Sequence, residues 1–275
     1  MQQDLYTCRQ TSDKKILVSL GGATATYNVN GATNGTSFAN QLWGMFGPRV
    51  DTWTSLNKPR PFDYVNTTSS DQTIHEFSAD GFDLDIEHPS LDKAAGYKAL
   101  VKRLRTLYAT ATDKPYYLTA SPQCSAGDSN LADMLTTSKF DMLFVQYYNT
   151  PLCSARGWIT ANPNYVPGGT VKETNTNWNF TFDSWVTWLS STVSKGAKIL
   201  ITLPGSNGAA NSGAYITVAQ TKNLASAYYC RASFAGIGVW DATYAESSIA
   251  NGKNFFQNAK AILNDASTDT RLSCV

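Results

Sequence analysis

The stretch from Ala79 to His88 reads ADGFDLDIEH and is the most informative segment of the chain. Three acidic residues alternate in it with three apolar ones, namely Asp83, Asp85 and Glu87 with Phe82, Leu84 and Ile86. Such an alternation is typical of a β-strand, in which successive side chains point to opposite faces. The acids are therefore expected on one face, with neighbours about 6–7 Å apart. Crowded carboxylates cannot all ionise cheaply, so the stretch predicts a strand that carries acid–base chemistry.

Two simpler interpretations of this stretch are less favoured. A half-buried surface strand would place the acids in solvent, but Asp is depleted in strands and three like charges on one face repel each other. A calcium site would use carboxylates, but no EF-hand-like Asp/Asn-Gly loop accompanies them. Catalysis is therefore the preferred interpretation of the three acids.

The composition argues against several classes of partner. The chain has 275 residues, of which 42% are hydrophobic and 16% charged, and its formal net charge is +1. This balance provides no basic patch for nucleic acid, and no apolar run reaches the length of a membrane span. The 7 Trp and 14 Tyr are expected mainly in the core, although aromatic rings also form stacking surfaces for sugars. The length permits one large domain or two small ones.

Several features favour a secreted, extracellular protein. Three N-glycosylation sequons begin at Asn34, Asn66 and Asn179. Five cysteines and abundant Ser, Thr and Asn also suit a secreted protein better than a cytosolic one. The first residues, MQQDLYTC, lack the basic and apolar regions of a signal peptide. We therefore expect a leader, or a longer segment, to precede this sequence.

Strands and helices are predicted to alternate along the chain. Short apolar runs predict strands, and apolar residues at helical spacing predict helices. The predicted strands cover residues 15–22, 79–88, 116–121, 140–146, 197–203 and 236–240, and the predicted helices cover residues 36–46, 91–111, 128–138, 183–194, 215–229 and 251–263. Residues 53–73 form an irregular insertion that is too long for an ordinary connection, which makes it a candidate substrate-side loop.

About six strand–loop–helix repeats indicate an α/β fold with parallel strands and right-handed crossovers. Both a TIM-type (β/α)8 barrel and a doubly wound sheet fit this pattern. No Gly-x-Gly-x-x-Gly turn opens a helix, so dinucleotide binding is not indicated, and we expect no cofactor and no metal. Polar residues gather where strands end, at Ser19, Glu87, Gln123, Tyr148 and Trp240. Chemistry drawn from the ends of many strands favours the barrel.

Residues 80–87 read DGFDLDIE, which resembles the D-x-x-D-x-D-x-E signature of the family 18 glycoside hydrolases. The resemblance is closest to the plant and fungal class III, hevamine-like chitinases. Further stretches agree in the same order, namely Ser19-Leu-Gly-Gly22, Ala120-Ser-Pro-Gln-Cys124, Gln146-Tyr-Tyr-Asn149 and Trp240. The resemblance covers nearly the whole chain, and it implies one catalytic domain over residues 1–275 with a TIM-type barrel.

The resemblance also implies a mechanism and a substrate. Glu87 is expected to protonate the glycosidic oxygen and later to activate water. The substrate's own acetamido oxygen, and no enzyme carboxylate, is expected to act as the nucleophile. Asp85 would orient this acetamide and stabilise the oxazolinium ion, while Asp83 shares a proton or hydrogen bond with Asp85. Tyr148 would donate a hydrogen bond to the acetamido carbonyl. The expected partner is chitin or a chitooligosaccharide.

Other residues are expected to contact the sugar chain. The resemblance implies that Trp240 forms the floor of the pocket, and Gln146, Asn149 and Gln123 are expected sugar contacts. Each has a simpler interpretation as well, because an aromatic residue at a strand end often only packs and an amide often only satisfies a loop. The mechanism does not need His88, which is interpreted as a loop histidine.

The cysteines are assigned mainly from the resemblance, which implies a disulfide between Cys124 and Cys153. Cys230 and Cys274 match no family motif, and their pairing is left open. Cys8 lies where the family has a cysteine whose partner is further upstream, so an odd number of cysteines is expected here.

The first predicted strand, near Ile16 to Leu20, resembles the third strand of the family's barrel, so the first two have no counterpart in this sequence. Such a barrel would have open strand edges, which favour self-association. Three interpretations are open: a fragment of a chitinase, a natural short variant whose edge is covered by loops or a partner, or a lectin-like sugar-binding cleft with little turnover. An endo-β-N-acetylglucosaminidase that acts on N-glycan cores is also left open.

Overall fold

The computed structural model describes residues 1–24, 26–66, 72–172, 174–175, 178–272 and 274. Its main feature is a six-stranded sheet with the strand order β1-β4-β5-β6-β9-β10. The strands are β1 (Val18–Gly21), β4 (Gly81–Asp85), β5 (Tyr117–Ala120), β6 (Met142–Gln146), β9 (Lys198–Pro204) and β10 (Phe234–Trp240). The pairs β1–β4, β6–β9 and β9–β10 are parallel. The predicted α/β fold with six strands in a parallel sheet is confirmed.

By their internal contacts the residues form two compact units. The first consists of residues 1–119 and 129–140, and the second of residues 120–128 and 141–275.

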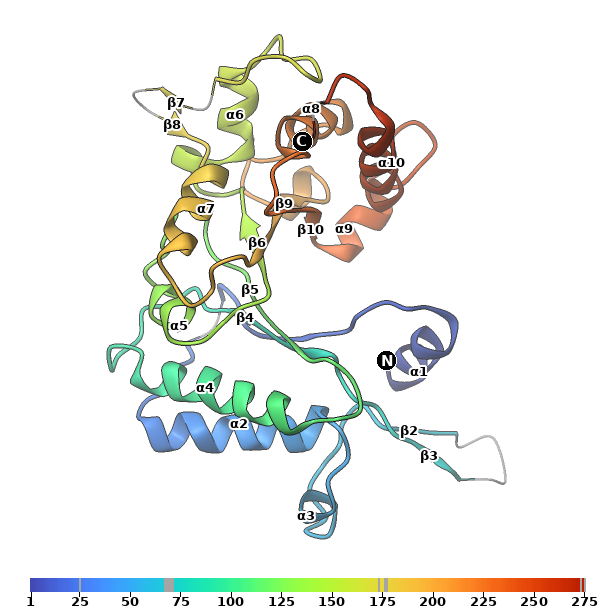
Figure 1. Cartoon of the computed structure of the whole chain (residues 1–275). Helices are drawn as coiled ribbons and strands as arrows, with labels where there is room; N and C mark the ends of the chain where they lie inside the picture. The colour runs from blue at the N-terminus through green and yellow to red at the C-terminus, as the bar shows by residue number, and fades with distance from the viewer. Residues whose placement is uncertain (25, 67–71, 173, 176–177, 273, 275) are drawn as a thin grey trace. The chain divides into compact units, whose positions relative to one another are not determined.

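In the first unit, two helices, α2 (Ala32–Phe46) and α4 (Ala95–Thr110), lie side by side (Figure 1). Two glycines allow this close approach. A Cβ on Gly35 would lie 2.0 Å from the carbonyl oxygen of Gly96, and a Cβ on Gly96 would lie 1.9 Å from that of Val29. Buried leucines, Leu42 and Leu100 among them, fill the core of this unit. The helix α2 begins earlier than the predicted Thr36, since its first turn is polar and carries no apolar periodicity.

The strands β1 and β4 of this unit pair in a register that sets Ser19 opposite Asp83 and Gly21 opposite Asp85. The apolar side of β4 is buried, as predicted from the alternation, with Phe82 only 1% and Leu84 0% exposed. The short helix α5 (Ala132–Thr137) also belongs to this unit.

The segment predicted as an irregular insertion has more regular structure than expected. It includes the end of α3 (Asp51–Thr54) and the strand β2 (Tyr64–Val65), which pairs antiparallel with β3 (Ile74–His75), while residues 67–71 lie outside the described residues. Arg60 organises this region: its guanidinium donates to the carboxylate of Asp63 at 2.9 Å and to the Phe77 carbonyl at 2.6 Å. A further helix, α1 (Gln2–Thr11), precedes β1 and was not predicted because its apolar pattern is weak.

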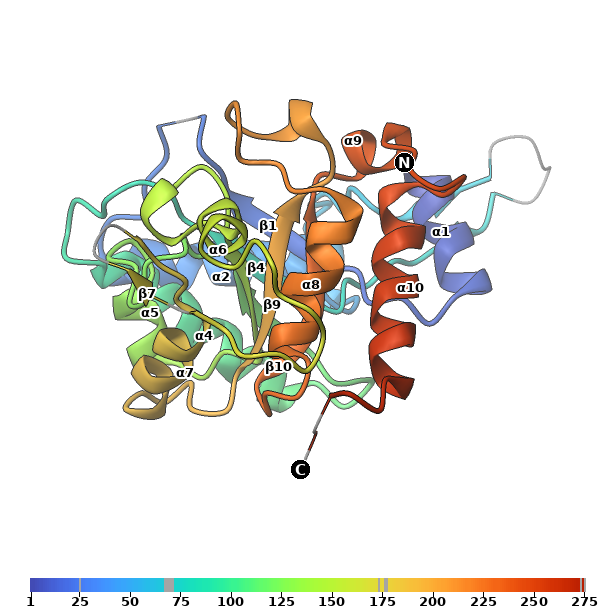
Figure 2. The same cartoon turned by 90° about the horizontal axis from the view of Figure 1, so that it is seen from above.

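The second unit holds the remaining helices, namely α6 (Ala155–Ala161), α7 (Phe182–Ser190), α8 (Val218–Tyr228), α9 (Ala242–Ser247) and α10 (Phe255–Thr268). It also holds two 3₁₀ turns, Pro151–Cys153 and Asn207–Ala209, and the short hairpin of β7 (Thr174–Asn175) and β8 (Trp178–Asn179). Figure 2 shows α8 and α10 side by side. Capping boxes at Thr217 and Asn254 fix the starts of these two helices, which explains why both begin later than predicted.

The core of the second unit is rich in aromatic side chains. Tyr147 stacks on Phe180 with ring centroids 4.4 Å apart, and Tyr228 contacts both Phe180 and Phe182. The predicted use of aromatic residues as core filling is thus confirmed for this group. In Figure 1, the helices α6, α7 and α8 lie around the strands β6 and β9.

Two disulfides stabilise the second unit. The bond between Cys124 and Cys153, which the resemblance implied, is confirmed, with Cα atoms 5.7 Å apart. A second bond joins Cys230 to Cys274, with Cα atoms 4.7 Å apart, and it resolves the pairing that the sequence left open. Cys8 belongs to neither disulfide.

Candidate active site

The three acids lie along β4 and just beyond its end, and the last two are more exposed than the first. Asp83 is 7% exposed, whereas Asp85 and Glu87 are half-buried. Ile86, on the opposite face, is only 3% exposed. The alternation therefore separates an apolar face from a face that carries the carboxylates, with the most accessible carboxylates nearest the carboxyl end of the strand.

Asp83 is held from both sides by hydroxyl groups of the neighbouring strands. Ser19 of β1 donates to one carboxyl oxygen at 2.8 Å, and Thr119 of β5 donates to the other at 2.6 Å. Hydrogen bonds to both oxygens stabilise a carboxylate and fix its orientation. The sequence singled out Ser19 but missed Thr119, although its inward position in a predicted strand was a signal that could have found it.

Tyr27 was not predicted as a site residue, yet its hydroxyl links the loop after β1 to the acidic segment. The backbone N–H of Glu87 donates to this hydroxyl at 2.9 Å. The hydroxyl lies 2.9 Å from the carbonyl oxygen of Gly22 and 3.1 Å from that of Asp85, which share its one proton. Burial raises the pKa of Tyr27, although donation from the Glu87 N–H opposes the rise, so the hydroxyl stays neutral. Tyr27 thus fixes the backbone on both sides of Ile86.

A glycine allows this arrangement. Gly21 has a φ of 119°, and a Cβ there would lie 2.0 Å from the carbonyl oxygen of Asp85. The next N–H, of Gly22, donates to that same oxygen at 2.7 Å. The Ser-Leu-Gly-Gly stretch therefore brings the end of β1 against the end of β4.

His88 follows Glu87 and packs against Tyr27 with its ring edge, at a centroid distance of 5.1 Å. Its Nε2 atom is buried and has no hydrogen-bond partner in the described part of the chain. It makes no contact that assigns it a chemical role, and its interpretation as a loop histidine stays a prediction.

At its other end, β4 is anchored by Asp80, which is 2% exposed. Its carboxylate accepts from the backbone N–H of Ile16 at 2.7 Å and pairs with Arg9 at 2.6 Å and Lys114 at 3.2 Å. Burial alone would raise the pKa of Asp80, but these donors outweigh burial and lower the pKa. Burial also lowers the pKa of Lys114 despite its carboxylate partner.

The remaining predicted residues belong to the second unit. Gln146, at the end of β6, is 6% exposed and donates to the Ser121 carbonyl at 3.0 Å. Its amide oxygen lies 3.5 Å from the amide nitrogen of Gln123, whose own oxygen accepts from Thr150 at 3.0 Å. The structure thus brings Gln123 and Gln146 together in one chain of amide contacts.

Tyr148 and Asn149 follow β6 directly. Tyr148 is 5% exposed, and Asn149 has a φ of 61° and accepts a hydrogen bond from the backbone N–H of Asn211 at 2.8 Å. Asn149 therefore satisfies a neighbouring loop, which is the simpler of its two predicted roles. Trp240, the last residue of β10, has a side chain that is 48% exposed, which is unusual for so large an apolar group. Its exposure suits a stacking surface better than core packing.

The described residues provide neither a metal site nor a membrane-spanning helix. No group of three or more His, Cys, Asp or Glu side chains there has an arrangement that would hold a metal ion. No described helix has both the length and the apolar character needed to cross a membrane.

Several solved structures resemble this one in fold. The xylanase and α-amylase inhibitor protein XAIP-II from Scadoxus multiflorus has a TM-score of 0.67 at 23% identity, covering 96% of this chain and 78% of that one. The ICChI chitinase from Ipomoea carnea has a TM-score of 0.64 at 23% identity, covering 95% of this chain and 78% of that one. At this level of identity the likeness concerns the fold, and it confirms the predicted TIM-barrel type of α/β fold.

Curated relatives are more similar in sequence. "Endochitinase A" of Emericella nidulans is 34% identical over 265 residues, which is 96% of this chain and 24% of that protein. "Endochitinase A1" of Aspergillus fumigatus is 35% identical over 266 residues, which is 96% of this chain and 28% of that protein. The chain thus spans about a quarter of the length of these relatives. The model of the glycosyl hydrolases family 18 matches residues 2–269, and the chain therefore belongs to this family.

Proposed function

We propose that this chain hydrolyses the β-1,4 linkages between N-acetylglucosamine units of chitin. The observation that carries the proposal is the graded burial of the acids on β4. Asp83 is buried and held by two hydroxyls, while Asp85 and Glu87 are half-buried at the carboxyl end of the strand. Membership of family 18 supports the proposal, as do relatives named endochitinases.

In this mechanism Glu87 is the general acid. It protonates the glycosidic oxygen as the bond to the leaving sugar breaks, and its carboxylate then removes a proton from the attacking water. The hydrogen bond from its backbone N–H to Tyr27 supports this role, because it fixes the Cα from which the carboxyl group projects. Tyr27 is thus a positioning residue for Glu87.

Asp85 and Asp83 serve the acetamido group of the substrate. The acetamido oxygen attacks the anomeric carbon, and Asp85 orients the group and stabilises the positive oxazolinium ion. Asp83 shares a proton or hydrogen bond with Asp85. Because both oxygens of Asp83 already accept hydroxyl donors, its position is fixed before substrate arrives.

Residues of the second unit bind the sugar in this proposal. Tyr148 donates to the acetamido carbonyl, and the exposed indole of Trp240 stacks against a sugar face. Gln146 and Gln123 are retained as polar sugar contacts, although both amides are engaged with other residues of the chain. Asn149 is retained as a sugar contact, although its side-chain oxygen is engaged with Asn211.

We also propose that the protein works outside the cell. Two disulfides support this, because such bonds persist in oxidising compartments and are rare in the cytosol.

The proposal is tested with a chitin hexasaccharide and its fully deacetylated glucosamine counterpart. We expect cleavage of the acetylated oligomer only, with the β-anomer of the product appearing first by NMR, because the acetamido oxygen acts as nucleophile and configuration is retained. An α-anomer formed first, or equal cleavage of the deacetylated oligomer, would contradict the mechanism. Release of N-glycans without chitin hydrolysis would favour an endo-β-N-acetylglucosaminidase. Tight binding of the chitin oligomer without any hydrolysis would favour a lectin-like protein.

A further inference from the structure

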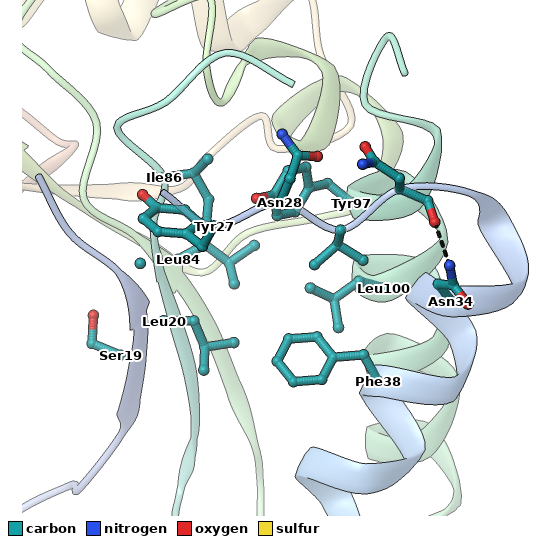
Figure 3. A pocket seen from close by; sticks show the side chains of 13 residues that line it. Ser19, Leu20, Tyr27, Asn28, Asn34, Phe38, Leu84, Ile86, Tyr97 and Leu100 are labelled. Atoms are coloured by element: carbon teal, nitrogen blue, oxygen red, sulfur yellow. Dashed lines mark hydrogen bonds between the residues drawn. The ribbon is translucent and has the colours of Figure 1, made fainter. Parts of the chain in front are cut away.

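A cavity of about 490 Å³ lies on the apolar side of the acidic strand, within the first unit (Figure 3). Its walls come from β1 and the loop that follows it, from β4 and the segment after it, and from the helices α2 and α4. Apolar side chains make up much of its lining, among them Leu20, Phe38, Leu84, Ile86 and Leu100, and the polar residues Ser19, Tyr27, Asn30 and Asn34 also line it. Because Leu84 and Ile86 alternate with the acids along the chain, the cavity lies behind the strand that carries the proposed catalytic groups.

The cavity has the character of a binding site. Its volume is within the range of about 300–1,000 Å³ that small-molecule sites occupy. Leu84 and Leu100 are 0% and 1% exposed and form a floor, whereas Leu20 and Phe38 are half-exposed. The half-exposed side chains mark an entrance, so the space is accessible to a ligand from solvent.

Two buried polar side chains in the wall have hydrogen-bonding capacity that the described residues do not use. The side-chain oxygen of Asn28 is buried without a partner among the described residues, while its amide nitrogen lies 3.4 Å from the Pro89 carbonyl oxygen. Tyr97 is 2% exposed; the Val29 backbone approaches its hydroxyl oxygen, and no described residue accepts the hydroxyl proton. Burial raises the pKa of Tyr97, so the hydroxyl stays neutral.

Buried polar atoms are rarely left unpaired, because each loses its hydration without compensation. Figure 3 shows Asn28 and Tyr97 on one side of the cavity and Phe38 on the other. A ligand that fits must therefore be apolar over most of its surface and carry one hydrogen-bonding group at one end. A sugar does not fit this description, since its many hydroxyls would be buried against leucine side chains.

We propose that this cavity binds a small phenol, that is, a single aromatic ring with one hydroxyl group. The ring lies against Leu84 and Leu100, and the hydroxyl donates to the side-chain oxygen of Asn28. The phenolic oxygen in turn accepts from Tyr97. This inference goes beyond the proposed hydrolysis and is independent of it, because neither the ligand nor its contacts include the three acids.

The test compares two probes of the same shape, 4-methylphenol and toluene. Binding to the whole chain is measured by ligand-observed NMR titration and by the shift in unfolding temperature. We expect 4-methylphenol to bind about tenfold more tightly than toluene, because only the phenol pairs with Asn28 and Tyr97. Equal affinity of the two probes, or no binding of either, would overturn the proposal.

Two variants and a matched control locate the site. Phe38→Trp adds bulk at the entrance and should weaken 4-methylphenol binding at least tenfold. Phe256→Trp makes the same change at a side chain of α10 that is 38% exposed, and it should have no effect. Asn28→Leu should remove most of the preference for 4-methylphenol over toluene. If circular dichroism shows that Phe38→Trp is unfolded, Asn28→Leu serves as the test in its place. Unchanged binding in both cavity variants would refute the assignment.

Discussion

Tyr27 provides a sharp test of how the fold positions the general acid. The substitution Tyr27→Phe keeps the ring, and with it the contact to His88, but removes the hydroxyl. The Glu87 N–H then loses its acceptor, which lies 2.9 Å away in the intact protein. The Asp85 carbonyl loses less, because it retains the hydrogen bond from the Gly22 N–H at 2.7 Å.

The expected magnitude follows from these contacts. A buried group left without its partner costs about 1–3 kcal/mol, and half-burial of Tyr27 favours the lower part of that range. We therefore expect the free energy of unfolding to fall by about 1–2 kcal/mol. A similar loss of positioning in the transition state lowers kcat about tenfold, since about 1.4 kcal/mol corresponds to a factor of ten. KM for a chitin oligomer should change little, because Tyr27 makes no proposed contact with the sugar.

The assay measures kcat and KM on a chitin hexasaccharide together with urea unfolding. Tyr215→Phe is the matched control, because that ring packs on Phe255 and no catalytic role is proposed for it. If Tyr27→Phe matched Tyr215→Phe in both kcat and unfolding free energy, the proposed positioning of Glu87 would be wrong. A rise in KM with unchanged kcat would contradict it equally.

Two further predictions concern stability. Asp80→Asn should lower the free energy of unfolding by about 2–4 kcal/mol at pH 7, because it leaves Arg9 and Lys114 without their buried carboxylate. The control is Asp265→Asn, which breaks the exposed ion pair with Lys222 and should lower the free energy of unfolding by less than about 1 kcal/mol. Because folding lowers the pKa of Asp80, the carboxylate contributes this stability above its ordinary pKa of 3.8 and loses it as the pH falls through the lowered pKa. The unfolding free energies of the unaltered chain and of Asp80→Asn, measured in urea, should therefore become equal in acid. Replacing both Cys124 and Cys153 by Ala should lower the free energy of unfolding by about 3–4 kcal/mol, from the entropy of a loop with a sequence separation of 29, whereas Cys8→Ser should have little effect.

The acidic strand was predictable from sequence because its information is local. Alternation alone assigned the strand and its two faces, and the apolar face is buried as expected. The alternation of strands and helices likewise predicted the parallel sheet. Helix starts were less predictable, because α10 begins where the Asn254 capping box forms and not where the apolar pattern begins.

The partners of the acids were not predictable in the same way. Thr119 and Tyr27 reach Asp83 and Glu87 from 36 and 60 residues away in the chain. Such contacts depend on strand register and loop path, which no local pattern encodes. The cavity behind β4 could not be predicted from sequence for the same reason. An apolar pattern predicts which residues are buried but not how completely their side chains fill the space between them.

The role of Glu87 is tested by the substitution Glu87→Gln, which keeps the shape of the side chain but removes the transferable proton. Hydrolysis of a chitin hexasaccharide is measured beside calorimetric binding of the same oligomer, with Glu76→Gln as the matched change at an exposed glutamate paired with Arg49. We expect Glu87→Gln to lower kcat by about 10²–10⁴-fold while the oligomer still binds, and Glu76→Gln to leave kcat unchanged. Hydrolysis by Glu87→Gln at the rate of the unaltered chain would contradict the assignment of Glu87 as the general acid.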